Sequence, residues 1–153
     1  MDWLDKVIET EGGYVNDPTD NGGETKYGIS KKAYPNEDIK NLTIERAKEL
    51  YIKDYVKPCK ADLLPLELQY AHFDSAVNFG VTGAAKILQE AAGVSADGKI
   101  GPITLKAAKS LQLSKYLLYR MFKYAYIVGN NNAQAKFIKG WANRVKELLW
   151  NWI

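Results

Sequence analysis

Glu11 is the side chain of this sequence best placed for acid–base chemistry, because it ends the apolar face of a short helix. Residues 2–11 have helical periodicity, and on a wheel of about 100° per residue Glu11 falls within the apolar arc. Burial and the carbonyl end of the helix dipole both favour a protonated carboxyl there. Such a group can protonate the leaving oxygen of a glycoside. The alternative is a solvated last residue of the helix. The residues that form the arc are Trp3, Leu4, Val7 and Ile8.

The loop that follows Glu11 offers two partners for such an acid. Residues 14–25 are rich in Asp, Asn, Gly and Pro, which favour turns, and a loop folded back as a hairpin would bring Asp20 and Thr25 toward Glu11. An inverting glycosidase holds a water between two carboxyl groups about 6.5–9.5 Å apart. Asp20 is therefore a candidate base, and Thr25 a candidate for orienting the water. The alternatives are a turn residue and an ordinary strand residue.

Two tyrosines flank this loop and are candidate substrate-binding residues. Tyr14 and Tyr27 suit stacking on sugars and contacts with hydroxyl groups, although packing is the more general role of such rings. The loop from Asp17 also imitates the start of an EF-hand calcium loop. Its twelfth position is Gly28, where that loop needs a bidentate glutamate. We expect no metal site and no cofactor.

The composition limits the remaining chemistry. The chain has 153 residues, enough for one domain with a sizeable core, and a net charge of +3. That charge favours weak attraction to polyanions of the cell wall but is too small to indicate nucleic acid. No apolar run reaches the roughly 20 residues of a spanning helix, so we expect no stable membrane insertion. The first residues lack the pattern of a secretory signal, which favours synthesis in the cytoplasm.

The single cysteine, Cys59, and the single histidine, His72, exclude most metal and nucleophile chemistries. A catalytic zinc site usually takes three protein ligands rich in these residue types. A cysteine peptidase built on Cys59 and His72 is an alternative that the sequence leaves open, against a small buried thiol and a satisfied histidine.

Helical patterns dominate after a short β-element, so we expect a mostly α (α+β) fold. A strand pattern covers residues 25–29, and Thr43 is a candidate helix cap. Pro58 is expected to end that helix, and Gly80 and Gly93 to end two later ones. The expected helices begin near residues 2, 43, 65, 84, 102, 114 and 133.

The N-terminal segment resembles the signature of glycoside hydrolase family 108, the phage-type N-acetylmuramidases. That family opens with an apolar helix ending in Glu-Gly-Gly-Tyr, followed by Asn-Asp-Pro, Gly-Gly-x-Thr and Tyr-Gly-Ile. The resemblance implies a lysozyme-like fold and a catalytic role for Glu11. The matching stretches here are Glu11 to Tyr14, Asn16 to Pro18, Gly22 to Thr25, and Tyr27 to Ile29.

The second half resembles the peptidoglycan-binding segment that follows this signature in such proteins. Asn78 lies in it, shortly before Gly80, and is a candidate for contact with substrate or, alternatively, for capping the end of a helix. Lys139 to Val145 resembles the closing helix of the family. The other matching pieces are Asp74, Ala76 to Gly80, Leu88-Gln89, Asp97-Gly98, Ile100 to Pro102, and Thr104.

The resemblance implies a lysozyme that cuts the β-1,4 bond between N-acetylmuramic acid and N-acetylglucosamine, with the peptidoglycan strand as its partner. A non-catalytic wall-binding or secretion-associated protein on the same fold is the alternative. We expect one domain over 1–153, with the muramidase signature in 1–65 and a helical region in 66–153. We also expect a monomeric, bacteriolytic endolysin of a phage or prophage that acts at the cell wall or periplasm. A holin-like permeabilising partner is implied by the family alone.

Overall fold

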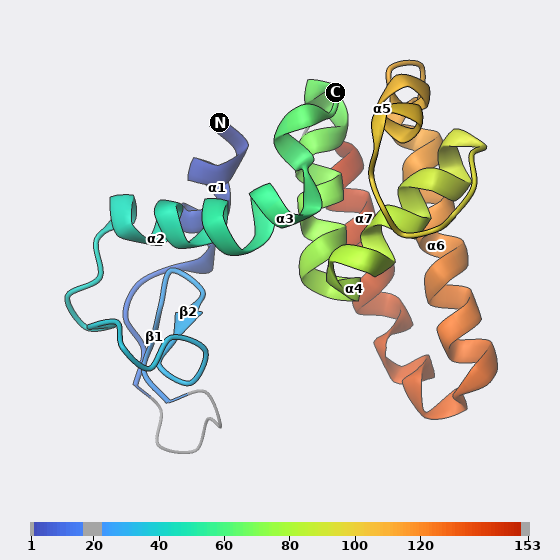
Figure 1. Ribbon diagram of the computed structural model, residues 1–153. Helices are drawn as coiled ribbons and strands as arrows, with labels where there is room; N and C mark the ends of the chain where they lie inside the picture. Colours follow the sequence, from blue (N-terminus) through green and yellow to red (C-terminus); the bar gives the residue numbers. More distant parts are fainter. Residues whose placement is uncertain (1, 17–22, 151–153) are drawn as a thin grey trace. The chain divides into compact units, whose positions relative to one another are not determined.

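The computed structural model describes residues 2–16 and 23–150 and divides into two compact units, 1–54 and 55–153 (Figure 1). In the first unit, α1 (Asp2–Glu11) packs against α2 (Ile44–Tyr51), and a small hairpin follows α1 in the chain. Gly12 has φ +82°, so α1 ends at a left-handed glycine. The core of this unit includes Trp3, Leu4, Ile8, Ile29, Ile39, Leu42, Ala47 and Leu50.

The β-element is a hairpin and not the single strand that the alternation over 25–29 predicts. β1 (Thr25–Lys26) and β2 (Ile29–Ser30) pair antiparallel, with Thr25 opposite Ser30. Tyr27 and Gly28 form the turn with φ of +53° and +75°. Positive φ at both central residues is typical of a type I′ hairpin turn. The turn therefore interrupts the strand at Tyr27, a residue type that seldom adopts this conformation.

A second strand contact, outside β1 and β2, pairs Val15 with Thr25. Val15 and Thr25 exchange two backbone hydrogen bonds of 2.8 Å each, which closes the loop between them. Asp20 itself lies in 17–22, outside the described residues.

Helical structure continues past the position where the sequence predicts a stop. Thr43 caps α2, its Oγ1 accepting from Arg46 N at 3.1 Å. The π-helical turn η1 (Ile52–Val56) then leads into α3 (Lys57–Cys59). Pro58 lies inside α3, where a missing N–H costs little in a first turn, and the chain leaves the helix at Lys60 with φ +56°. The prediction that Pro58 ends the helix is wrong.

In the described part of the second unit, the regular secondary structure is helical. After the end of η1 and α3, its elements are η2 (Ala61–Leu63), α4 (Leu66–Ala92), α5 (Pro102–Ala108), α6 (Leu113–Asn130), the 3₁₀ segment η3 (Asn132–Phe137) and α7 (Ile138–Trp150). Helix α6 packs along α4, and α6 and α7 form a helical hairpin joined by η3 (Figure 1). The core includes Leu68, Ala85, Ile87, Leu88, Ala91, Tyr116, Leu117 and Leu148.

Most predicted helix boundaries in this unit are confirmed. α4 is interrupted at Gly80 (φ +74°, ψ 162°) and ends at Gly93 (φ +72°). Pro102 is the first residue of α5. α6 instead begins at Leu113 with Gln112 as its cap, so Ser114 lies inside it. The prediction of a helix from about residue 133 holds, except that its first turns are 3₁₀.

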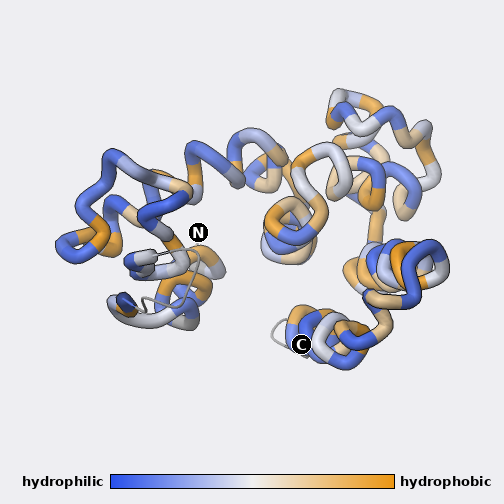
Figure 2. Tube along the Cα trace, turned by 90° about the horizontal axis from the view of Figure 1, so that it is seen from below, coloured by the Kyte–Doolittle hydropathy of each residue, from blue (hydrophilic) through white to orange (hydrophobic). Residues whose placement is uncertain are grey.

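In the described ranges, no helix combines the length and the apolar character that a bilayer crossing needs. Hydrophilic and hydrophobic residues alternate along the helices of both units (Figure 2).

Candidate functional site

The C-terminal end of α1 is tied to the hairpin turn, and this contact positions Glu11. Tyr27 N donates to Gly12 O at 3.1 Å. A Cβ built on Gly28 would lie 3.3 Å from Glu11 Cγ and 3.4 Å from Glu11 Oε2. The Glu11 side chain therefore lies directly against the backbone of the turn. Glycine at position 28 permits both the positive φ and this close approach.

Tyr51 holds the turn from the other side. Its ring is buried in the first unit, and its hydroxyl donates to Tyr27 O at 3.1 Å. A Cβ on Gly28 would also overlap the Tyr51 hydroxyl. The sequence shows Tyr51 only as part of the apolar face of a helix, so its supporting role was not predicted.

The Glu11 side chain is exposed, which corrects the expectation that it lies in a desolvated place. Trp3, Leu4 and Ile8 are at most 2 % exposed, so the apolar face of α1 is confirmed. The helix ends at Glu11 and the chain turns away at Gly12, so the core does not extend to the last residue of that face. The carboxyl of the free protein is in contact with solvent.

The other candidates of the first unit lie in and beside the hairpin. Thr25 is half-buried, and its hydroxyl donates to Gly23 O at 3.4 Å. The exposed Tyr14 donates its hydroxyl to Glu24 Oε1 at 2.7 Å, and this hydrogen bond raises the pKa of Tyr14. Tyr27 is in the turn itself, with the ammonium of Lys26 5.3 Å from its ring centroid. The structure thus brings Tyr27 and Glu11 to the same turn.

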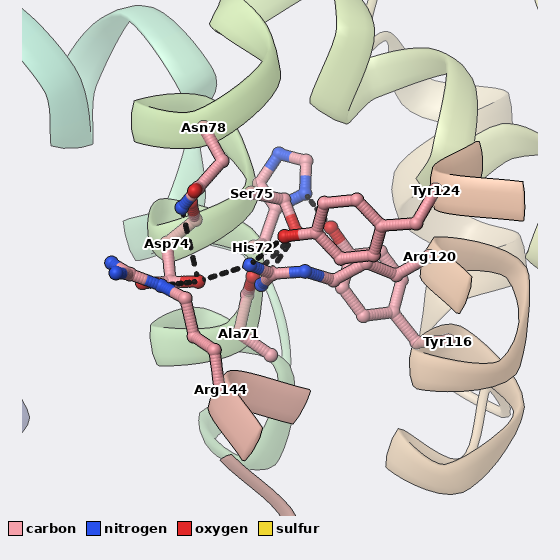
Figure 3. Close-up of polar contacts among 9 residues, drawn as sticks. All are labelled: Ala71, His72, Asp74, Ser75, Asn78, Tyr116, Arg120, Tyr124 and Arg144. Atoms are coloured by element: carbon pink, nitrogen blue, oxygen red, sulfur yellow. Dashed lines mark hydrogen bonds and ion pairs between the residues drawn. The ribbon is translucent and has the colours of Figure 1, made fainter. Parts of the chain in front are cut away.

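Asn78 belongs to the second unit, where it borders a buried charge cluster (Figure 3). Its Nδ2 donates to Asp74 O at 2.7 Å and lies 3.4 Å from Asp74 Oδ2. Asp74 lies between the guanidinium groups of Arg120 and Arg144, accepting at 2.5 Å from Arg120 Nη2 and at 2.8 Å from Arg144 Nε. Arg144 also pairs with Asp74 through Nη2, and this contact raises the pKa of Arg144.

Arg120 is the fully buried member of this cluster. Its Nη2 lies 3.1 Å from the Tyr124 hydroxyl and its Nη1 3.3 Å from Ser75 Oγ. Its guanidinium carbon is 5.7 Å from the ring centroids of both Phe79 and Tyr124. Arg120 Nε has no hydrogen-bond partner among the described residues. The cluster fastens α4 to α6 and α7, and it fixes the orientation of Asn78.

Cys59 and His72 do not form a nucleophile–base pair. His72 Nε2 donates to the backbone Cys59 O at 3.0 Å, and Nδ1 lies 3.1 Å from the Tyr116 hydroxyl. Both side chains are buried. Burial raises the pKa of the Cys59 thiol to about 11 and lowers the pKa of His72 to about 4. The thiol is thus neither activated nor accessible, and the cysteine peptidase alternative is wrong.

The Asp97-Gly98 stretch, which matches the family in sequence, forms a loop between α4 and α5. Gln89 is buried and donates from Nε2 to Asp97 Oδ1 at 2.7 Å and to Lys99 O at 3.1 Å, while its Oε1 accepts from Gly98 N at 2.8 Å. Gly98 has φ +79°, and a Cβ there would lie 2.8 Å from Thr82 Cγ2. These contacts hold the connection between α4 and α5 in place. Gln89 and Asp97-Gly98 therefore have a structural role in this loop.

Two protein-family models match this chain, one in each half. Residues 4–80 match the family model described as Glycosyl hydrolase 108. The chain belongs to the glycosyl hydrolase 108 family. Residues 83–146 match a second model, described as Predicted Peptidoglycan domain. The two matched segments adjoin at the Gly80 interruption of α4.

A solved structure supports the same assignment. The chain is similar to the protein in the structure titled "Structure of Brucella abortus SagA", with 31 % identity and a TM-score of 0.73. The similarity covers 96 % of this chain and 89 % of that one. No curated protein sequence matches this chain. The fold is mostly α and lysozyme-like, as the sequence predicts, and family and domain together support a glycoside hydrolase that acts on peptidoglycan.

Proposed function

We propose that this protein is a lysozyme that cleaves the β-1,4 bond between N-acetylmuramic acid and N-acetylglucosamine, with Glu11 as general acid. The observation that carries the proposal is the fixed position of Glu11 against the Gly28 turn in a chain of the glycosyl hydrolase 108 family. The adjoining peptidoglycan domain supports the choice of substrate.

The reaction needs a proton at the leaving oxygen and a water at the anomeric carbon. Glu11 gives its proton to the glycosidic oxygen as the bond to C1 breaks. Water then bonds to C1 and loses its proton to Asp20, and Thr25 orients that water. Because Glu11 is exposed in the free protein, the bound glycan itself must exclude water from the carboxyl.

The remaining candidates are proposed to bind the glycan. Tyr27 lies in the hairpin turn that contacts Glu11, and Tyr14 lies three residues after Glu11 in the chain. Both offer ring faces to sugar rings. Asn78 offers its amide oxygen, because its Nδ2 already donates to Asp74. We expect a monomer that acts at the cell wall without a cofactor and reaches it through a holin-like partner, as an endolysin does.

Substituting Glu11→Gln tests the proposal. Removing a general acid costs about 10²–10⁴-fold in rate, so clearing of a cell-wall suspension should fall by at least 100-fold. Glu9→Gln is the matched control, since Glu9 is an exposed carboxylate of the same helix, and it should clear at the wild-type rate. Sedimentation with purified walls should show equal binding of all three proteins.

Two results would contradict the proposal. Equal clearing by wild type and Glu11→Gln would remove Glu11 from the reaction. Wall binding without clearing by any of the three proteins would favour the alternative, a non-catalytic wall-binding protein.

A further inference from the structure

The C-terminal part of the chain is strongly basic over a long stretch. Residues 98–146 contain ten Lys and Arg and no Asp or Glu, although the whole chain has 21 basic and 18 acidic side chains. The rest of the chain is therefore acidic overall. Within the described part, Arg120 and Arg144 are the members of this stretch that form salt bridges, both with Asp74. Its eight lysines lie on the surface, seven exposed and Lys123 half-buried.

An apolar stripe runs along α6 within this basic stretch. Leu118, Phe122 and Tyr126 follow one another at four-residue spacing, so they share a face of the helix, and they are 51 %, 57 % and 66 % exposed. Phe137 and Ile138 are also exposed where η3 meets α7. Exposed large apolar side chains in such number mark an interaction surface.

Lysines border the stripe and its rings. Lys115 lies on the same face of α6, three residues before Leu118. The ammonium of Lys123 is 5.5 Å from the ring centroid of Tyr126. That of Lys136 is 5.1 Å from the ring centroid of Phe137. Lysines beside exposed apolar side chains are complementary to a partner surface in which anionic groups cover an apolar phase.

From this juxtaposition we infer that the α6–α7 hairpin binds the anionic headgroup layer of a lipid bilayer, with the stripe in the acyl boundary and the lysines on phosphate. Basic amphipathic helices with Phe and Leu on one face bind bilayers in this way, and anionic lipid adds about 1 kcal/mol per lysine. A wall polymer or a nucleic acid attracts the lysines equally but offers no apolar phase for Leu118 or Ile138. The interaction is peripheral, and it does not depend on hydrolysis.

Sedimentation with vesicles tests the inference on the full chain. Binding to phosphatidylglycerol–phosphatidylcholine vesicles should exceed binding to pure phosphatidylcholine at least tenfold and fall with added salt. Lys115→Gln with Lys123→Gln should weaken it about 30-fold, the factor that corresponds to about 1 kcal/mol for each lysine. Lys32→Gln with Lys40→Gln, an equal charge change in the first unit, is the control and should bind as wild type.

A second pair of variants tests the apolar part. Phe122→Ser with Tyr126→Ser should weaken vesicle binding at least tenfold, because both rings lose their place in the acyl boundary, while Ile103→Ser on α5 should leave it unchanged. Equal losses in the lysine variants and their control would overturn the inference. So would a stripe variant that binds vesicles as wild type, which would assign the basic stretch to soluble polyanions. Glu11→Gln should bind vesicles normally, so failure here is distinct from failure of the hydrolase proposal.

Discussion

Gly28 is the residue on which the geometry around Glu11 depends. Its positive φ makes the hairpin turn, and its missing side chain leaves room for both Glu11 and the Tyr51 hydroxyl. The glycine of the Tyr-Gly-Ile signature is thus required by the structure of the turn. The turn carries Tyr27 and supports Glu11 at once.

We predict that Gly28→Ala lowers the free energy of unfolding by about 2–3 kcal/mol and also lowers activity. About 1 kcal/mol comes from an alanine at positive φ, and the rest from overlap with the Tyr51 hydroxyl. Denaturant unfolding measures the first effect and wall clearing the second. Gly23→Ala is the control, because Gly23 has φ +68° but open space around its Cβ position, and it should cost only about 1 kcal/mol.

The overlap can be tested separately. Adding Tyr51→Phe to Gly28→Ala removes the overlapping hydroxyl and should recover part of the lost stability. If the double variant is less stable than Gly28→Ala by the full cost of Tyr51→Phe alone, the overlap is not the cause.

The buried His72 makes the free energy of unfolding depend on pH in the acidic range. Its pKa is about 4 in the folded protein and about 6.5 in an unfolded chain. Above pH 6.5 both states are neutral and the residue has no effect. As the pH falls toward 4 the unfolded chain binds a proton that the folded protein does not, so stability falls by up to about 3 kcal/mol.

Urea unfolding at pH 7, 5.5 and 4.5 measures this dependence. His72→Gln keeps a polar side chain but no titrating group, so its stability should change less over the same pH range. Parallel pH dependence in the two proteins would show that other groups cause the acid sensitivity.

At the scale of elements, the Asp74 cluster fastens α4 to α6 and α7. We predict that Asp74→Asn costs about 3–5 kcal/mol, because it leaves the buried Arg120 without a counter-charge. Arg144→Gln should cost about 1 kcal/mol or less, because the Arg144 side chain is 44 % exposed. Thermal or denaturant unfolding compares them.

A double variant separates charge from packing in this cluster. Adding Arg120→Met to Asp74→Asn removes the unpaired charge and should restore part of the stability. Equal losses in Asp74→Asn and Arg144→Gln would contradict the central position of Asp74.

The elements that the sequence predicts well are those with local signals. Gly80 interrupts α4 and Gly93 ends it, both at positive φ, and Pro102 begins α5. The hairpin turn was missed because Tyr27 adopts a positive φ that its residue type does not suggest. Pro58 failed as a stop because it falls in the first turn of a new helical segment.

The candidate site was predictable only in part, because its contacts join residues that are far apart in the sequence. The helical wheel gives the direction of Glu11 but not the point where the core ends, so it could not decide between a buried acid and the exposed last residue that the structure has. Arg120 follows an apolar helix pattern, and its partner Asp74 comes from a distant helix, so no local signal marks their contact. Asp20 and its catalytic role stay a prediction.

At the scale of the whole molecule, the hydrolase match crosses both compact units. It covers residues 4–80 and so includes the first part of α4 with Asp74 and Asn78. The peptidoglycan domain begins after the Gly80 interruption. The organisation as one domain, with regions 1–65 and 66–153, stays a prediction. The acidic remainder and the basic stretch 98–146 give the chain a marked charge asymmetry.

The most direct measurement is mass analysis of peptidoglycan digested by wild type and by Glu11→Gln, after borohydride reduction of new chain ends. The account predicts fragments that end in reduced N-acetylmuramic acid from wild type, and none above background from Glu11→Gln. Fragments ending in reduced N-acetylglucosamine or anhydro-muramic acid, or the same fragments in equal yield from both proteins, would contradict it.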